Sequence, residues 1–118
     1  MSNRVVIKFG GADLSGGERI RKAAELVVKS GYKEKVVVVS AIGNMTDSLA
    51  GMVSNIGGVE DQDYAEVISM GERMSVRLLC SALRSLKTRA QYFDPASVNW
   101  PIITDSNFRH ANPNAKRT

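Results

Sequence analysis

Short runs of apolar, mostly β-branched residues predict the strands of this chain. Val5–Ile7 and Val36–Val39 are the two clearest runs, and each leads into small or polar residues that begin a loop. The four consecutive valines are apolar on both faces, which is typical of a central strand in a parallel sheet. Ala90–Phe93 and Ile102–Ile103 are further candidate strands in the proline-containing last quarter.

Helical spacing of apolar residues predicts a first helix between the two clear strands. The apolar positions recur at i, i+3, i+4, i+7 and i+8, with charged residues on the opposite face: Ile20, Ala23, Ala24, Val27 and Val28. Ser15 and Glu18 have the spacing of a capping box that would open this helix. Gly31 is suited to end it.

Two more helices are expected after the valine strand. A shorter one covers about Thr46–Val53 and is broken by Gly57–Gly58. A long one follows a second capping box, made by Asp63 and Glu66, and Gly71 interrupts it in the middle. Its apolar side is formed by Tyr64, Val67, Ile68, Leu78, Leu79, Ala82 and Leu83.

This order of elements predicts a parallel α/β domain with helices on both faces of the sheet. Ligands of such domains bind at the carboxyl ends of the strands. Those ends are Lys8–Gly11 and Ser40–Gly43, so the chemistry is expected in these two loops.

Composition narrows the class of protein. A chain of 118 residues with 43% hydrophobic and 24% charged residues has room for one globular domain. No apolar run approaches the roughly 20 residues of a membrane helix, and the first residues are too polar for a signal peptide. The single cysteine excludes an internal disulfide, and with one histidine it cannot build a zinc site. We expect a cytoplasmic protein with no bound metal and no membrane partner.

The formal net charge of +4 does not indicate a nucleic-acid-binding protein. Arg109, Lys116 and Arg117 supply most of the excess from the last ten residues, and elsewhere basic and acidic residues are mixed. No basic strand carries interleaved aromatic residues for base stacking. A nucleic-acid partner is therefore not expected.

The first loop has the residues of a phosphate-handling site. Lys8 places an ammonium group at a strand end, and Gly10 and Gly11 let backbone N–H groups approach an anion closely. The segment is not a P-loop, because Gly17–Glu18 stands where Lys-Ser/Thr is required. The alternative is a tight strand–helix turn with an exposed lysine.

The second loop offers two hydroxyl groups that could donate to carboxylate or phosphate oxygens. They belong to Ser40 and Thr46, on either side of a run of small residues. The alternative is that Thr46, or Asn44, simply caps the helix that follows.

Glu72 is a candidate for binding a ligand ammonium group. Its helical neighbours at i±3 and i±4 include no lysine or arginine, and it follows Gly71 on a stripe of small and apolar residues. A salt bridge to another element is the alternative. Arg73 and Arg77 are like charges at i, i+4 and are expected to face solvent.

Four segments together resemble the aspartate kinase (aspartokinase) family. They stand in the family's order, at suitable separations, and cover essentially the whole chain: Val6–Gly11, Val37–Ala41 with Thr46–Asp47, Ser69–Ser75, and Ile103–Phe108. The resemblance implies the amino-acid-kinase fold, a three-layer α/β/α sandwich with a mainly parallel sheet. It also implies transfer of the ATP γ-phosphoryl group to the β-carboxylate of L-aspartate, which gives 4-phospho-L-aspartate and begins lysine, threonine and methionine biosynthesis.

The resemblance assigns roles to the candidate residues. Lys8 matches the lysine that neutralises the transferring phosphoryl group, and Gly10 and Gly11 match the glycines whose amides approach it. Ser40 and Thr46 match substrate-loop hydroxyls, and Glu72 matches the carboxylate that faces the substrate amino group. ATP and Mg²⁺ are the implied cofactors, L-aspartate is the implied partner, and a homo-oligomer is implied for the full-length enzyme.

The chain departs from the family pattern in two ways. Ala12–Asp13 replaces the usual Thr-Ser after the glycines, which affects local hydroxyl contacts. The chain also resembles only the amino-terminal portion of the catalytic domain: residues 1–118 lack the Gly-rich substrate segment, the nucleotide-binding half and any regulatory domain. We therefore expect this chain to be inactive alone.

Other functions stay open from sequence. One is a kinase of the same fold that acts on glutamate, acetylglutamate or a nucleoside monophosphate, although the Lys-Phe-Gly-Gly and Met-Gly-Glu-Arg pairings disfavour it. The other is a non-catalytic half-domain that serves assembly or regulation.

Overall fold

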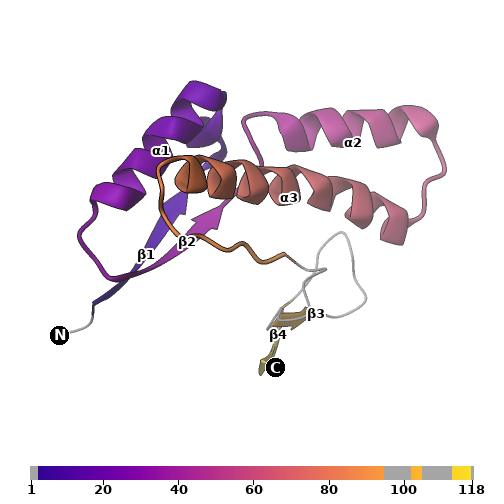
Figure 1. The fold of residues 1–118 in the computed structure, drawn as a ribbon. Helices are drawn as coiled ribbons and strands as arrows, with labels where there is room; N and C mark the ends of the chain where they lie inside the picture. The colour runs from indigo at the N-terminus through magenta and orange to yellow at the C-terminus, as the bar shows by residue number, and fades with distance from the viewer. Residues whose placement is uncertain (1–2, 95–101, 105–112, 118) are drawn as a thin grey trace.

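A computed structural model of the protein describes residues 3–94, 102–104 and 113–117. Strands β1 (Arg4–Phe9) and β2 (Glu34–Val39) form a parallel pair, in register with Val6 opposite Val36. Helix α1 (Gly17–Lys29) connects them and lies over one face of the pair beside helix α3 (Asp61–Ser85), as Figure 1 shows. The predicted parallel α/β arrangement is confirmed.

Helix α1 begins and ends close to the expected residues, but for partly different reasons. A short 3₁₀ turn, η1 (Gly11–Leu14), precedes it, and Gly16 is its N-cap without a side-chain hydrogen bond. The expected Ser15–Glu18 capping box is therefore wrong. Gly31 follows the last turn with φ of 81°, so its role in ending the helix is confirmed.

Helices α2 (Met45–Ile56) and α3 are both longer than the sequence predicted. Glu60 is the N-cap of α3 and makes no side-chain capping bond, so the Asp63–Glu66 capping box is also wrong. Helix α3 runs without a break through Gly71. The glycine is explained by close packing, described below.

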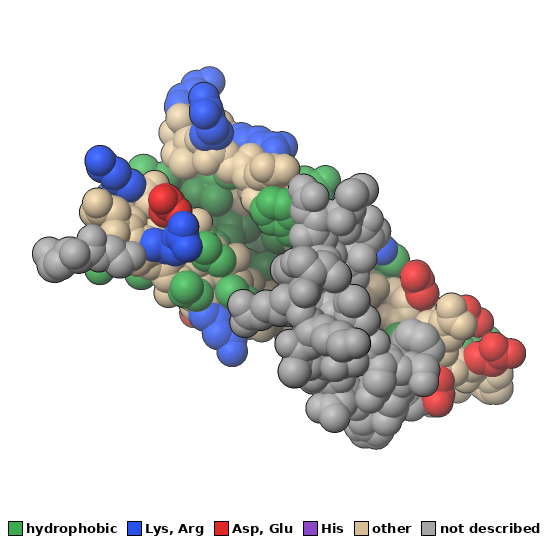
Figure 2. All heavy atoms as spheres, turned by 90° about the horizontal axis from the view of Figure 1, so that it is seen from below, with side chains coloured by type: hydrophobic (Ala, Val, Ile, Leu, Met, Phe, Trp, Pro, Cys, Tyr) green, Lys and Arg blue, Asp and Glu red, His purple; other side chains and the backbone are tan. Residues whose placement is uncertain are grey.

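The second face of the β1–β2 pair is uncovered within the described residues. Val6, Val36 and Val38 lie on this face and are 65%, 48% and 46% exposed. Figure 2 views the molecule from this side and shows hydrophobic side chains at the surface next to lysine and arginine. The expectation that β2 is buried on both faces is wrong for this part of the chain. Two of the three layers of an α/β/α sandwich are present, so the fold is partial.

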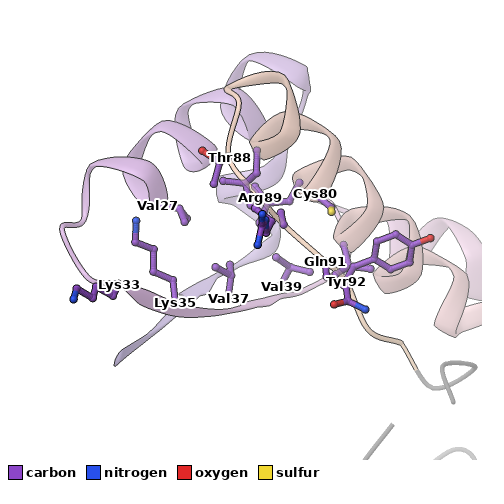
Figure 3. Close-up of a pocket in the computed structure, with 14 residues that line it drawn as sticks. Val27, Lys33, Lys35, Val37, Val39, Cys80, Thr88, Arg89, Gln91 and Tyr92 are labelled. Carbon is purple, nitrogen blue, oxygen red and sulfur yellow. The ribbon is translucent and has the colours of Figure 1, made fainter. Parts of the chain in front are cut away.

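Residues 88–94 form no strand, contrary to the prediction for Ala90–Phe93. The segment passes beside β2 but is held by helix α3 (Figure 3). Arg84 donates hydrogen bonds of 3.1 and 2.9 Å to the Ala90 carbonyl, and the Arg77 guanidinium lies 4.6 Å from the centre of the Tyr92 ring. These side-chain contacts hold the segment without strand pairing.

A second small sheet lies near the end of the chain. Strand β3 (Ile102–Thr104) covers the predicted Ile102–Ile103 strand, and it pairs antiparallel with β4 (Pro113–Arg117), which was not predicted. His110 and the acidic part of the Ile103–Phe108 segment lie outside the described residues.

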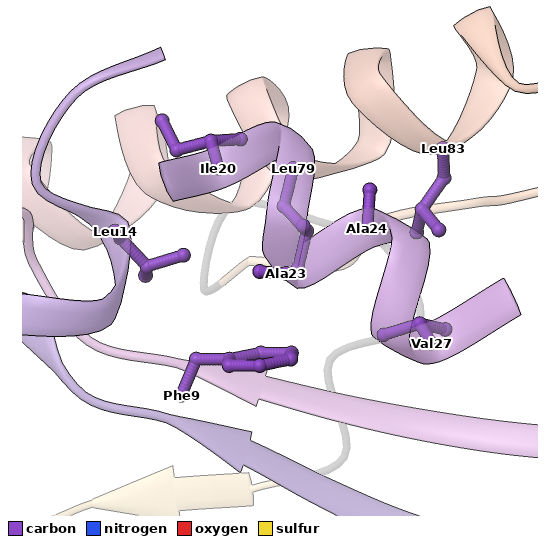
Figure 4. Close-up of a cluster of buried hydrophobic side chains, with 8 residues drawn as sticks. All are labelled: Phe9, Leu14, Ile20, Ala23, Ala24, Val27, Leu79 and Leu83. Carbon is purple, nitrogen blue, oxygen red and sulfur yellow. The ribbon is translucent and has the colours of Figure 1, made fainter. Parts of the chain in front are cut away.

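The core forms between the covered sheet face and the two helices. Figure 4 shows Phe9 pointing from β1 toward α1, with side chains of α3 behind. Its buried members are Phe9, Leu14, Ile20, Ala23, Ala24, Val27, Leu79 and Leu83. Because Phe9 is the last residue of β1, this core fixes the point where the chain leaves the strand and enters the first loop.

Candidate functional site

The two strand ends lie side by side, as the parallel arrangement predicts. Phe9 is opposite Val39, and the Ser40 N–H donates a 3.3 Å hydrogen bond to the Phe9 carbonyl. The loops that follow β1 and β2 therefore leave the sheet from adjacent positions.

Gly11 brings the two loops into direct backbone contact. The Gly43 N–H donates a 2.9 Å hydrogen bond to the Gly11 carbonyl. A Cβ atom built at Gly11 would lie 2.7 Å from the Ala41 carbonyl oxygen, which is closer than a Cβ atom can approach a backbone oxygen. Glycine is required at this position by space.

Gly71 brings helix α3 to the same place. A Cβ atom at Gly71 would lie 3.0 Å from the Ala41 Cβ and 3.4 Å from the Met45 Cγ. Gly71 and Ala41 are both buried. The sequence-based inference that something passes close to Gly71 is confirmed, and the neighbour is the loop after β2.

Ala41 is thus the meeting point of three segments, which we call the Ala41 junction: the loop at Gly11, the loop after β2, and α3 at Gly71. The junction draws together Gly10 and Gly11, Ser40, and the α3 turn that carries Glu72. These residues are up to 62 positions apart in the chain (10 to 72).

Lys8 lies three residues before Gly11, and Thr46 lies five residues after Ala41. Lys8 is exposed on the uncovered face of β1, and its ammonium group makes no hydrogen bond or ion pair with another described residue. Thr46 lies in the first turn of α2. Asn44 is the N-cap there, as the capping alternative placed it, although its side chain makes no capping hydrogen bond. Thr46 is not the N-cap, so the capping alternative is wrong for Thr46.

Glu72 is exposed and has no ion pair or hydrogen bond with the described part of the chain. The salt-bridge alternative therefore finds no support among those residues. Its carboxylate is open to a cationic group from solvent, next to the Ala41 junction.

Arg73 and Arg77 do not simply face solvent, which corrects the sequence-based expectation. Their guanidinium groups lie 3.3 and 2.7 Å from the carboxylate of Asp94, whose side chain is only 5% exposed. The hydrogen bond with Asp94 raises the pKa of Arg77, and Tyr92 adds to the shift. Sequence reasoning missed Asp94, because no local spacing links it to α3.

The Asp13 side chain accepts a hydrogen bond from Gly10, one of the residues whose backbone N–H was expected to face an anion. Its Oδ2 accepts a 3.0 Å hydrogen bond from the Gly10 N–H and caps the η1 turn. Asp13 is one of the two residues that depart from the family's Thr-Ser. The Gly10 N–H, predicted from sequence to approach an anion, is therefore already bonded to a carboxylate of the chain itself.

The described residues hold no group of three histidine, cysteine, aspartate or glutamate side chains that could bind a metal ion. None of the described helices is both long and apolar enough to cross a lipid bilayer. Two cavities, of about 260 and 300 Å³, are lined by none of the six candidate site residues.

Curated relatives of this chain are aspartokinases. That of Corynebacterium efficiens is 38% identical over 111 residues, which are 92% of this chain and 25% of the relative. That of Rickettsia felis is 30% identical over 115 residues, 91% of this chain and 28% of the relative. The chain spans about a quarter of the length of these relatives.

Solved structures give the same result. The crystal structure of aspartate kinase from Synechocystis superposes with a TM-score of 0.78 at 31% identity, over 86% of this chain and 17% of that one. Escherichia coli aspartokinase III in complex with aspartate and ADP gives a TM-score of 0.76 at 22% identity, over 92% and 34% of the two chains, and supports the fold alone. The family model of the amino acid kinase family matches residues 3–117. With its βαβ core and its junction of strand-end loops, this chain belongs to the amino acid kinase family and is of the aspartate kinase type.

Proposed function

We propose that residues 1–118 form the amino-terminal, substrate-binding portion of a catalytic domain that phosphorylates the β-carboxylate of L-aspartate. MgATP is the phosphoryl donor and 4-phospho-L-aspartate is the product, which enters lysine, threonine and methionine biosynthesis. The aspartokinase relatives support the substrate, and the relatives' greater length supports a further nucleotide-binding half.

The Ala41 junction is the observation that carries this proposal. At the ends of two parallel strands it gathers a lysine-preceded glycine pair and a serine. Helix α3 adds a glutamate that has no partner among the described residues. Such a set can accept an amino acid with its ammonium group on Glu72 and its carboxylates toward Ser40 and Thr46.

In the proposed reaction, a β-carboxylate oxygen of aspartate attacks the γ-phosphorus, and the bond to the bridging oxygen breaks to release ADP. The protein's contribution is positioning and charge stabilisation, since phosphoryl transfer needs little covalent help. Lys8 is the cation at the strand end that would meet the transferring group. The Gly11 amide and a Gly10 amide released by Asp13 would approach its oxygens.

A chimera tests the proposal. The matching quarter of the Corynebacterium efficiens aspartokinase is replaced by this chain, and aspartyl phosphate is trapped with hydroxylamine. We expect ATP- and aspartate-dependent hydroxamate formation. In this chimera Glu72→Gln should raise the aspartate KM about ten- to a hundredfold, because a charge-assisted hydrogen bond contributes roughly 1.5–3 kcal/mol. The ATP KM should hardly change.

Glu66→Gln is the matched control, since Glu66 is also an exposed glutamate of α3. It should leave both KM values unchanged. A well-folded chimera without activity would favour the second candidate, a non-catalytic half-domain. The observation behind that candidate is the Asp13 carboxylate on the Gly10 amide, which opposes anion binding.

A further inference from the structure

A cavity of about 260 Å³ lies at the free edge of β2, away from the Ala41 junction. We call it the edge cavity. Its walls come from β2, α3, the end of α1 and the segment after α3. Figure 3 shows that the strand, the helix and residues 88–92 enclose it from three sides. In the described part of the chain β2 pairs only with β1, so no strand fills this edge.

Apolar side chains form one part of the wall of the edge cavity, and polar groups form the rest. Val27, Val37, Val39, Val76, Leu79 and Leu83 line it, together with Cys80, which is 4% exposed. Such a surface favours a ligand with an apolar body, because burying apolar area is the main gain of small-molecule binding.

The polar lining of the edge cavity carries charge of one sign. Lys33, Lys35 and Arg89 contribute cations, and no acidic side chain lines the cavity. Lys33 and Arg89 make no hydrogen bond or ion pair with other described residues, while Lys35 donates a 3.4 Å hydrogen bond to the Val28 carbonyl. Three cations beside a partly apolar wall are complementary to an anion and repel an ammonium group.

The size of the cavity sets the size of the ligand. A volume of 260 Å³ is that of roughly nine water molecules at about 30 Å³ each, so it admits a molecule of about eight or nine non-hydrogen atoms. We propose that the edge cavity binds a small monocarboxylate with an unbranched aliphatic body of about six carbons, its carboxylate toward Arg89 and Lys35. This site is separate from the proposed aspartate site.

Hexanoate is the probe for this proposal, with norleucine and hexylammonium as matched ligands. Norleucine has the same skeleton with an added ammonium group, and hexylammonium reverses the charge. The chain has a single cysteine, so selective ¹³C-cysteine labelling gives one NMR signal from the cavity wall. Hexanoate should shift the Cys80 signal saturably, and the other two molecules should not.

Variants that remove one positive charge each test which side chains bind the carboxylate of hexanoate. Arg89→Gln should weaken hexanoate binding about tenfold or more, the scale of one lost charge-assisted hydrogen bond. Lys35→Gln should weaken it in the same direction, and Arg21→Gln, on the exposed face of α1, should leave it unchanged. Circular dichroism checks that each variant is folded.

Three results would overturn the proposal. They are no shift of the Cys80 signal with hexanoate, a shift with norleucine as large as that with hexanoate, or an equal loss of hexanoate affinity in Arg89→Gln and Arg21→Gln. None of these measurements uses aspartate or ATP. A failure here therefore leaves the kinase proposal untouched, and a failed chimera leaves this one untouched.

Discussion

The carboxylate of Asp13 accepts a 3.0 Å hydrogen bond from the backbone N–H of Gly10. The same amide is one of those expected to meet a phosphate oxygen in the first loop. One N–H group cannot donate a strong hydrogen bond to two negatively charged acceptors at once, so Asp13 and an anion compete for the Gly10 N–H.

Asp13→Ser should therefore strengthen anion binding at this loop. In the chimera we expect the ATP KM to fall several-fold, because one charge-assisted competitor is removed while a serine hydroxyl still caps η1. Glu18→Ser removes the same charge from the exposed first turn of α1 and serves as control. Equal effects of the two variants would show that only net charge matters.

Lys8→Ala should lower kcat of the chimera far more than it raises the aspartate KM. The lysine acts on charge that develops during transfer, so the loss is expected on the order of 10²-fold. Lys22→Ala, an exposed lysine of α1, is the control and should leave kcat unchanged. Steady-state kinetics measures both. An unchanged kcat in Lys8→Ala would support the alternative of a tight turn with an exposed lysine.

Gly71→Ala tests the Ala41 junction through stability. Alanine in a helix interior normally stabilises by up to about 1 kcal/mol relative to glycine. At Gly71 the added methyl would lie 3.0 Å from the Ala41 Cβ, and overpacking of this kind costs about 1–3 kcal/mol. We expect a net decrease in the free energy of unfolding, measured by urea denaturation.

Gly51→Ala is the matched control for Gly71→Ala. Gly51 lies within α2, and nothing would lie within 4 Å of its added Cβ, so this variant should gain stability. Ala41→Gly in the Gly71→Ala background should recover part of the loss. Similar gains in both single variants would mean that α3 and the loop do not pack as described.

Asp94→Asn tests the anchor between α3 and the segment after it. Asp94 is 5% exposed and accepts from two arginines, so removing its charge should cost about 1–3 kcal/mol of unfolding free energy. Glu34→Gln removes an exposed partner of Arg4 and should cost about 1 kcal/mol or less. Thermal unfolding of both variants compares them. Equal losses of stability in the two variants would show that the buried ion pairs of Asp94 stabilise the fold no more than the exposed ion pair of Glu34.

Local sequence patterns predicted most of the helices and strands but not the residues that cap the helices. Strands β1, β2 and β3 and the three helices follow from apolar spacing, whereas β4 does not, and Gly31 ends α1 as expected. Both Ser/Asp–Glu capping boxes failed, because the chain enters each helix through Gly16 and Glu60 instead. The Ala90–Phe93 strand failed because arginines of α3 hold that segment, a contact that sequence alone does not reveal.

The sequence nominates the residues of the candidate site, whose roles stay predictions, but it does not show the tertiary contacts among them. Strand ends and glycines point to Gly10, Gly11 and Ser40 without any structure. That Gly11 and Gly71 both pack on Ala41 depends on tertiary contacts, and so does the pairing of Arg73 and Arg77 with Asp94. Neither contact has a fixed spacing along the chain.

The uncovered face of the sheet has a consequence for the colloidal behaviour of the chain. Val36–Val39 is an uncharged β-branched run of the kind that nucleates cross-β stacking, and two of its valines are about half exposed. Lys33, Glu34 and Lys35 stand directly before it as gatekeeper charges. Replacing Lys33 and Lys35 with alanine should shorten the lag time of thioflavin-binding fibrils, whereas Lys22→Ala should not. We therefore expect the lysines at the start of β2 to limit cross-β stacking of its valines.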